Sequence, residues 1–390
     1  MNDKNQAETS AGTGRSRIHS RELPPTLSLI LAFFIGLLLT IPTLIISGGQ
    51  LLVAKLVWIA FIGWMSFRVF VTGRISKWRT VFFVLMAWAF VLEFKANLLG
   101  ITGSAWLASE IREVPYCHIA IVSNLSNYFY SIWQALSHGN FLKWSAFYAG
   151  ALLWLITSLT IGQGFCSWGC FYGGLDTTFS KILKKPLLRR FHLPRPLRDF
   201  SLALLGAMLL ISLACFQPIY CLWVCPLKIT TGFLDPDTVI RKIQLAIFCA
   251  TGILFLIALP LVMKKRTFCT FLCPFGAWQA MVGRVNPFRV SIDADRCTLC
   301  QQCLKACPVY AIDKDGVLKH EVLSYCDRCA DCFEVCPTGA IDYTVLGEKP
   351  KKISARTLYL LSAWLLGGAL SLLFVPNAML RIFHSVSSVF

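Results

Sequence analysis

Eight of the 17 cysteines in the chain fall in two runs of identical spacing. Residues 297–307 read CTLCQQCLKAC, residues 326–336 read CDRCADCFEVC, and a proline follows each run. This C-x2-C-x2-C-x3-C-P pattern is typical of bacterial ferredoxins with two 4Fe–4S clusters, in which the fourth cysteine of each run binds the other cluster. The spacing places three thiolates on a tight loop and leaves a distant fourth to complete the coordination of an iron–sulfur cube.

An internal repeat of 29 residues supports this interpretation, because ACPVYAID at 306–313 matches VCPTGAID at 335–342. Zinc sites are the alternative, but zinc motifs pair two C-x2-C units and lack a fourth cysteine before proline. We therefore expect two 4Fe–4S clusters. The predicted ligands of the first cluster are Cys297, Cys300, Cys303 and Cys336, and those of the second are Cys326, Cys329, Cys332 and Cys307.

Six further cysteines form three C-x3-C pairs, each at the end of an apolar segment. The pairs are Cys166 with Cys170, Cys221 with Cys225, and Cys269 with Cys273. A spacing of four residues directs two side chains to the same face of a helix. Such a pair can supply two ligands to a metal site or close a redox-active disulfide.

The elements that position these cysteines are predicted to be membrane helices. The chain is 56% hydrophobic and 15% charged, whereas soluble domains are roughly 45–50% apolar and about 25% charged. Crossing a bilayer takes about 20 apolar residues. Seven segments are long enough: 26–47, 51–71, 80–97, 142–162, 199–217, 243–263 and 357–376.

Lysine and arginine indicate the orientation, because they are enriched in loops on the cytoplasmic side. They gather in the N-terminal tail, after the second, fourth and sixth segments, and before the seventh. We therefore expect the N-terminus and the ferredoxin-like part in the cytoplasm of a bacterium, and the C-terminus outside. The net charge of +17 follows from this distribution and does not indicate a nucleic-acid partner.

The predicted orientation sorts the other nine cysteines. We expect Cys249 to be an apolar filler inside the sixth segment. The other eight divide into two groups of four, the number that a thiolate-bound metal or cluster requires. The predicted inner thiolate site consists of Cys166, Cys170, Cys269 and Cys273, and the predicted outer thiolate site consists of Cys117, Cys215, Cys221 and Cys225.

At these residues the chain resembles the membrane-bound polyferredoxins of the NapH/NosR/CcoG type, over roughly residues 142–345. The resemblance implies electron transfer, in NapH-type proteins from membrane quinol toward a partner redox protein. It also implies that Cys166, Cys170, Cys269 and Cys273 are the paired motifs of the family and that the eight cysteines of the two runs are its cluster ligands. Phe171 departs from the family pattern, which has proline at that position, and the Cys221–Cys225 pair is additional.

The fold class that we predict is an all-α polytopic membrane protein of about seven transmembrane helices, with a small α+β ferredoxin-like domain inserted before the last helix. The predicted domains are a disordered basic tail at 1–25, transmembrane helices at 26–100, an outer loop at 101–141, a transmembrane core with the three C-x3-C pairs at 142–289, a double 4Fe–4S ferredoxin domain at 290–346, and a C-terminal transmembrane helix with a short outer tail at 347–390.

The predicted function is iron–sulfur electron transfer at the cytoplasmic membrane, similar to that of a quinol dehydrogenase subunit. Electrons pass between quinone or a cytoplasmic donor and a partner redox protein, in contact with membrane lipid. Two 4Fe–4S clusters are expected, with a further cluster or metal at the C-x3-C pairs and quinone as additional candidates. The alternatives are a transmembrane thiol–disulfide reductase that uses Cys221 and Cys225, and an assembly factor that reduces a metal ion for a partner enzyme.

Overall fold

The computed structural model is mostly helical and divides into two compact units. The residues that it describes are 22–97, 118–123, 155–188, 194–215, 217–226, 238–345 and 353–387, with a few single residues between them. The first unit comprises Met1–Phe90, Thr160–Gly174 and Val285–Phe390, and the second comprises Val91–Leu159 and Leu175–Arg284.

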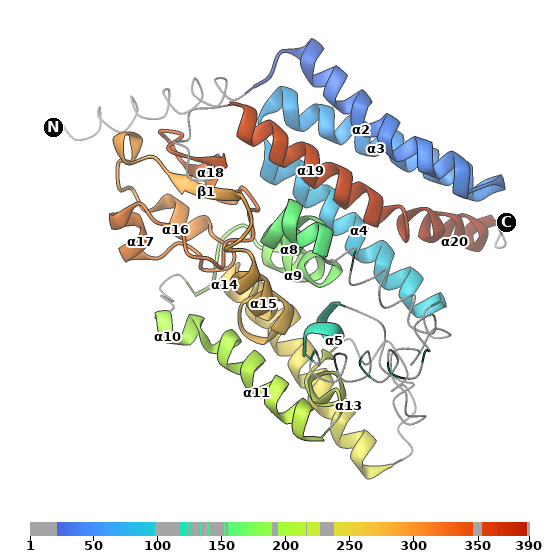
Figure 1. The fold of residues 1–390 in the computed structure, drawn as a ribbon, viewed down its shortest axis with the longest axis vertical. Helices are drawn as coiled ribbons and strands as arrows, with labels where there is room; N and C mark the ends of the chain where they lie inside the picture. The colour runs from blue at the N-terminus through green and yellow to red at the C-terminus, as the bar shows by residue number, and fades with distance from the viewer. Residues whose placement is uncertain are drawn as a thin grey trace. The chain divides into compact units, whose positions relative to one another are not determined.

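Long apolar helices form the larger part of the first unit (Figure 1). They are α2 (Pro25–Ile46), α3 (Gly49–Thr72), α4 (Ile75–Asn97), α19 (Ile353–Ser371) and α20 (Val375–Ser387). The indole of Trp58 in α3 donates a 2.8 Å hydrogen bond to Ser371 at the end of α19, and Phe82 of α4 packs on Trp364 of α19. Phe33 on α2 is 70% exposed, which suits a surface that faces lipid rather than water.

The ferredoxin-like part of the first unit is a two-stranded antiparallel sheet with short helices. Strand β1 (Phe288–Ile292) pairs with β2 (Ile341–Val345), so that Phe288 lies opposite Val345 and Ile292 opposite Ile341. Between the strands lie α16 (Gln302–Ala306), α17 (Lys314–Lys319) and α18 (Asp331–Val335). These short helices and the sheet lie within residues 288–345, and the predicted domain boundaries stay a prediction.

Within its described residues, the second unit contains one long helical segment and several shorter helices. The helices α13 (Val239–Gly252), η7 (Ile253–Ala258) and α14 (Leu259–Met263) follow one another without a break, and the Thr238 side chain caps the first of them. The short elements are α5 (His118–Ser123), α10 (Arg195–Arg198), α11 (Phe200–Cys215), α12 (Ile219–Trp223), η8 (Phe268–Leu272) and α15 (Pro274–Val282).

Among the described residues, four helices are long and apolar enough to cross a membrane, or up to five if a bent pair forms one span. The four are Pro25–Ile46, Gly49–Thr72, Ile75–Glu93 and Val239–Met263, and the bent pair joins Ala355–Ser371 to Val375–Ser387 at 43°. The predicted fifth segment appears as α11, which has only 16 residues. The predicted fourth segment, 142–162, lies largely outside the described residues. The prediction of a membrane protein is confirmed, whereas the count of seven spans is not.

One contact in the second unit corrects the predicted topology. The ring of His118 packs edge-on against that of Phe275, with 4.5 Å between the ring centroids. The charge pattern predicts the loop with His118 outside and the residues after Cys273 inside. Because the hydrocarbon core of a bilayer is about 30 Å thick, residues in ring contact cannot lie on opposite sides of it. The predicted separation of these two segments is therefore wrong.

The Cys221–Cys225 loop contacts the middle of a candidate span. The Val224 carbonyl accepts a 3.4 Å hydrogen bond from Thr251, which is the central residue of the candidate span Val239–Met263. At a rise of 1.5 Å per residue, Thr251 is about 18 Å from each end of that span. The preceding helix α11 is only about 24 Å long, shorter than the roughly 30 Å hydrocarbon core of a bilayer. The outer position of Cys221 and Cys225 stays a prediction.

Candidate metal centres

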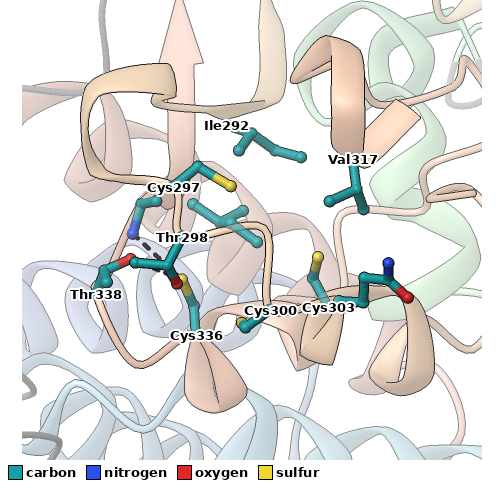
Figure 2. Close-up of a pocket in the computed structure, with 11 residues that line it drawn as sticks. Ile292, Cys297, Thr298, Cys300, Cys303, Val317, Cys336 and Thr338 are labelled. Atoms are coloured by element: carbon teal, nitrogen blue, oxygen red, sulfur yellow. Dashed lines mark hydrogen bonds between the residues drawn. The ribbon is translucent and has the colours of Figure 1, made fainter. Parts of the chain in front are cut away.

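The first predicted quartet comes together around one cavity (Figure 2). Its four sulfurs face a common space that Ile292 and Val317 cover on the far side. Burial, together with the charges of Cys336, Cys300 and Cys297, raises the pKa of Cys303 to about 11. The members are Cys297 and Cys300 from the first loop, Cys303 from α16, and Cys336 from the end of α18.

The second quartet comes together in the same way. Burial raises the pKa of Cys332 well above that of a free thiol, and the charges of Cys329, Cys326 and Cys307 act in the same direction. Burial raises the pKa of Cys326 to about 12, with further contributions from Asp327 and Cys307. Each group of neighbouring thiols therefore contains three cysteines from one run and the fourth from the other, and their role as cluster ligands stays a prediction.

The backbone repeats along with the cysteines. Three pairs of residues, each 29 apart, adopt left-handed conformations: Leu299 and Arg328 (φ 54° and 54°), Gln301 and Ala330 (φ 57° and 63°), and Tyr310 and Gly339 (φ 53° and 63°). Left-handed φ values are uncommon for residues other than glycine and are retained where a site requires them. Here they bend each loop so that three thiols face inward.

The two quartets fit 4Fe–4S clusters by their donors. Each offers four thiols, the ligand set of a cuboidal cluster. In each, a backbone N–H also donates to the sulfur of the fourth cysteine: Ala311 to Cys307 at 3.2 Å, and Ala340 to Cys336 at 3.3 Å. Such N–H···S bonds are a known influence on cluster reduction potentials. Within the described part of the chain, no three His, Cys, Asp or Glu side chains form a group that could hold a single metal ion.

The two cluster loops differ in their surroundings. In the first, Cys300 is exposed and Leu299 is 43% exposed. In the second, every residue from Asp327 to Asp331 is at most 7% exposed. The repeat therefore gives two similar ligand sets, one near the surface of the first unit and one inside it.

Helix α4 supplies part of the cover over the second loop. The Arg79 guanidinium is fully buried and forms a 3.1 Å ion pair with Asp331, between Cys329 and Cys332. Ser76 donates a 2.5 Å hydrogen bond to the same carboxylate oxygen. The Tyr343 hydroxyl donates to the Arg328 carbonyl at 2.8 Å. In the sequence, Arg79 is one of the basic residues that follow the second apolar segment, and no local spacing signal links it to Asp331, which lies 252 positions away.

The three C-x3-C pairs share one local geometry. In each, the first cysteine lies in a short helix and the second just after that helix ends. In each, the second cysteine donates its backbone N–H to the carbonyl of the residue that precedes the first cysteine: Cys170 to Phe165 at 2.9 Å, Cys225 to Tyr220 at 3.0 Å, and Cys273 to Phe268 at 3.0 Å. The two cysteines of each pair therefore do not share one continuous helix, because the helix ends before the second cysteine.

The third pair has a buried acidic neighbour. The Asp176 carboxylate accepts a 3.0 Å hydrogen bond from the backbone N–H of Cys269. Burial raises the pKa of Asp176 to about 7, while this N–H and the charge of Arg266 partly oppose the rise. Asp176 belongs to the GFCSWGCFYGGLD segment that carries the first pair. The first motif therefore supplies a side chain that orders the loop of the third.

The predicted inner and outer quartets remain predictions. Cys166 and Cys170 belong to the first unit, and Cys269 and Cys273 to the second. Of the predicted outer set, Cys221 and Cys225 are buried, Cys215 is exposed, and Cys117 lies outside the described residues. Cys249 is half-buried in α13.

The fold and the two thiol quartets define the class: a membrane-associated iron–sulfur protein. A family model for the 4Fe–4S dicluster domain matches residues 289–337, which include both loops. A second family model, a 4Fe–4S binding domain, matches residues 144–193, 200–237 and 245–292. Each of these three matches contains one C-x3-C pair.

Known relatives are similar over part of the chain. The YccM protein of Escherichia coli strain K12, named for electron transport, is 29% identical over 41% of this chain and 46% of its own length. The regulatory protein NosR of Stutzerimonas stutzeri is 25% identical over 45% of this chain and 24% of its own. The methylamine utilization ferredoxin-type protein MauN of Paracoccus denitrificans is 39% identical over 14% of this chain and 20% of its own. No solved structure matches.

The chain thus spans about half or less of the length of the curated relatives that it matches. The domain matches and these relatives together show that the chain is similar to membrane-associated ferredoxin-type electron transport proteins of the NosR/NapH-like type.

Proposed function

We propose that the chain relays electrons at a bacterial cytoplasmic membrane, between quinol or a cytoplasmic donor and a partner redox protein. The observation that carries this proposal is the pair of four-thiol sites within one compact unit that also contains candidate membrane helices. A 4Fe–4S cluster, when bound, takes up and releases a single electron. The residues of the chain hold the two clusters at different depths below its surface.

The C-x3-C pairs support a route that continues into the membrane. All three pairs have the same hydrogen-bonded turn, and all three fall within matches to a 4Fe–4S binding domain. The Cys221–Cys225 loop lies beside the middle of the candidate span Val239–Met263. We therefore propose that the pairs bind a further cluster or metal.

Metal content tests the proposal directly. Full-length protein purified without oxygen should contain about eight irons and about eight labile sulfides if only the two ferredoxin sites are filled. Roughly twelve or more irons per chain would indicate an additional cluster at the C-x3-C pairs. Cys269→Ser should then remove only the excess, and Cys249→Ser, the matched control, should remove none. A preparation with zinc and no labile sulfide would overturn the assignment.

Reduction by quinol tests the finer claim. In lipid nanodiscs, a short-chain quinol should produce the electron paramagnetic resonance (EPR) signals of reduced clusters within the turnover time of a membrane redox complex. Reduction by dithionite but not by quinol would retain the iron–sulfur assignment and exclude quinol as the donor.

A further inference from the structure

A single buried arginine connects the second cluster loop to the first C-x3-C loop. Through one nitrogen, Arg79 binds the Asp331 carboxylate at 3.1 Å. Through the other terminal nitrogen, it donates to the carbonyl of Ser167 at 3.2 Å. Asp331 lies between two predicted cluster ligands, and Ser167 lies between Cys166 and Cys170. One guanidinium therefore contacts both sites.

A second arginine forms a parallel connection. Arg328, between Cys326 and Cys329, is 5% exposed and donates to the carbonyl of Ile161, just before the first C-x3-C motif. Gly162 has φ of 55°, and a Cβ on it would collide with the Arg328 side chain. The close approach of this loop therefore requires glycine at position 162. Both arginines join the second cluster loop to the segment of Cys166 and Cys170.

The position equivalent to Asp331 in the first cluster loop carries no acidic side chain. The residue 29 positions before Asp331 is Gln302, which is exposed. A charge beside the first loop that can serve for comparison is Arg296, an exposed side chain that donates to the Thr338 carbonyl at 3.1 Å. Exposed charges are screened by water and salt, whereas buried charges act in a medium of low dielectric constant. A buried pair should therefore affect the second cluster selectively.

We propose that Arg79 is a positioning residue that holds the second cluster loop against the Cys166–Cys170 loop and that, with Asp331, sets the reduction potential of the second cluster apart from that of the first. This inference rests on the proposed function. A cluster gains one negative charge on reduction, so the positive charge of Arg79 favours the reduced form and the negative charge of Asp331 disfavours it. The second cluster is thus the one coupled to the membrane cysteines, and the first faces outside partners.

The test is a redox titration of full-length protein followed by EPR, with iron content measured in parallel. The second cluster's signal is identified by its absence from Cys329→Ser. Arg79→Gln should lower the midpoint potential of that signal and Asp331→Asn should raise it, while the other signal stays unchanged. Arg79→Lys retains the positive charge, so the midpoint potential of the second cluster should stay close to the wild-type value. The control Arg296→Gln should change the midpoint potential of neither signal measurably.

The opposite signs separate an electrostatic role from a purely structural one. If loss of packing alone mattered, both substitutions would shift the potential in the same direction, and that result would overturn the proposal. Equal shifts of both clusters, or no shift, would also overturn it. If Arg79→Gln loses the second cluster, the double variant Arg79→Gln/Asp331→Asn, which has no unpaired buried charge, should regain it with a midpoint between those expected for the single variants. Failure of the double variant to regain it would contradict the proposal.

Failure of the underlying function gives a different result. Wild-type protein would then show no cluster signals at all, so that no midpoint could be compared. Two normal signals with the wrong response to Arg79→Gln and Asp331→Asn would reject only the role of Arg79.

Discussion

The two cluster loops have the same spacing, the same left-handed residues and the same N–H···S contacts, yet their surroundings are opposite. Leu299 and Cys300 of the first loop reach the surface, whereas the Arg328 and Cys329 side chains, 29 positions later, are about 5% exposed. The repeat therefore determines how four thiols converge. The rest of the fold determines how much water, charge and protein surround them.

This difference assigns separate roles to equivalent sites. Cluster potentials depend on solvent exposure and on nearby hydrogen bonds as well as on the ligands. A site at the surface is accessible to a soluble partner, and a site packed against α4 and the Cys166–Cys170 loop is accessible to the membrane helices. Duplication of one loop followed by burial of one copy is enough to produce an ordered pair.

The largest expected effect comes from removing the equivalent ligands Cys303 and Cys332, which are 8% and 7% exposed. Each serine substitution should remove one cluster, about half of the ferredoxin iron. Because metal binding contributes to folding free energy and the second loop packs on α4, Cys332→Ser should lower the melting temperature more than Cys303→Ser. Iron assays and thermal circular dichroism measure both effects. Equal melting temperatures of Cys303→Ser and Cys332→Ser would contradict the claim that the second loop is better packed than the first.

The next effect concerns access of a chelator to iron. Iron should leave in two phases, because the first loop is exposed and the second must open before a chelator can reach it. We expect the rates to differ by at least about tenfold, equivalent to ~1.4 kcal/mol of opening free energy. Absorbance of the iron–chelator complex follows the release. Cys303→Ser should retain only the slow phase, and a fast phase in that variant would reverse the assignment.

A smaller effect is expected from Tyr343→Phe, which removes the hydroxyl that donates to the buried Arg328 carbonyl. Loss of a buried hydrogen-bond donor typically costs about 1–3 kcal/mol. Thr298→Val in the exposed first loop is the control and should change the free energy of unfolding by no more than about 0.5 kcal/mol. Denaturant unfolding compares the two. A larger loss of unfolding free energy in Thr298→Val than in Tyr343→Phe would mean that the first loop is better packed than the second.

The smallest effect is expected at the left-handed positions Gln301 and Ala330. Glycine adopts this conformation without strain, so Gln301→Gly should stabilise the exposed loop by about 0.5–1 kcal/mol. At Ala330, which is 2% exposed, the lost Cβ contacts offset this gain, and Ala330→Gly should be close to neutral. Thermal unfolding of the two variants distinguishes them. Stabilisation of both by the same amount would show that burial at Ala330 contributes nothing.

Much of the site could be predicted from the sequence because cluster ligation depends on local spacing. The two runs of cysteines and the proline after each were sufficient to predict which thiols converge. Burial of the second loop could not be predicted, since it depends on Arg79 and Asp331, which are 252 positions apart. Arginine near the end of a span also usually indicates a cytoplasmic loop, so the sequence contains no separate signal for the ion pair between Arg79 and Asp331.

The topology was predicted less well for a physical reason. Charge counting assumes that each apolar segment crosses the whole bilayer. Helix α11 has only 16 residues, and the loop that follows brings Val224 into contact with Thr251. The C-x3-C spacing also suggested a continuous helix, but the helix ends before Cys170, Cys225 and Cys273. Turns of this kind depend on tertiary packing, which hydropathy does not record.

The central claim is that one repeated loop holds two 4Fe–4S clusters in unequal environments. The most direct measurement is EPR power saturation of the reduced protein with a water-soluble paramagnetic relaxant, in Cys332→Ser and in Cys303→Ser. The cluster that remains in Cys332→Ser is the first, and its signal should relax faster as relaxant is added. The cluster that remains in Cys303→Ser should be nearly insensitive. Equal sensitivity of the two signals would contradict the account.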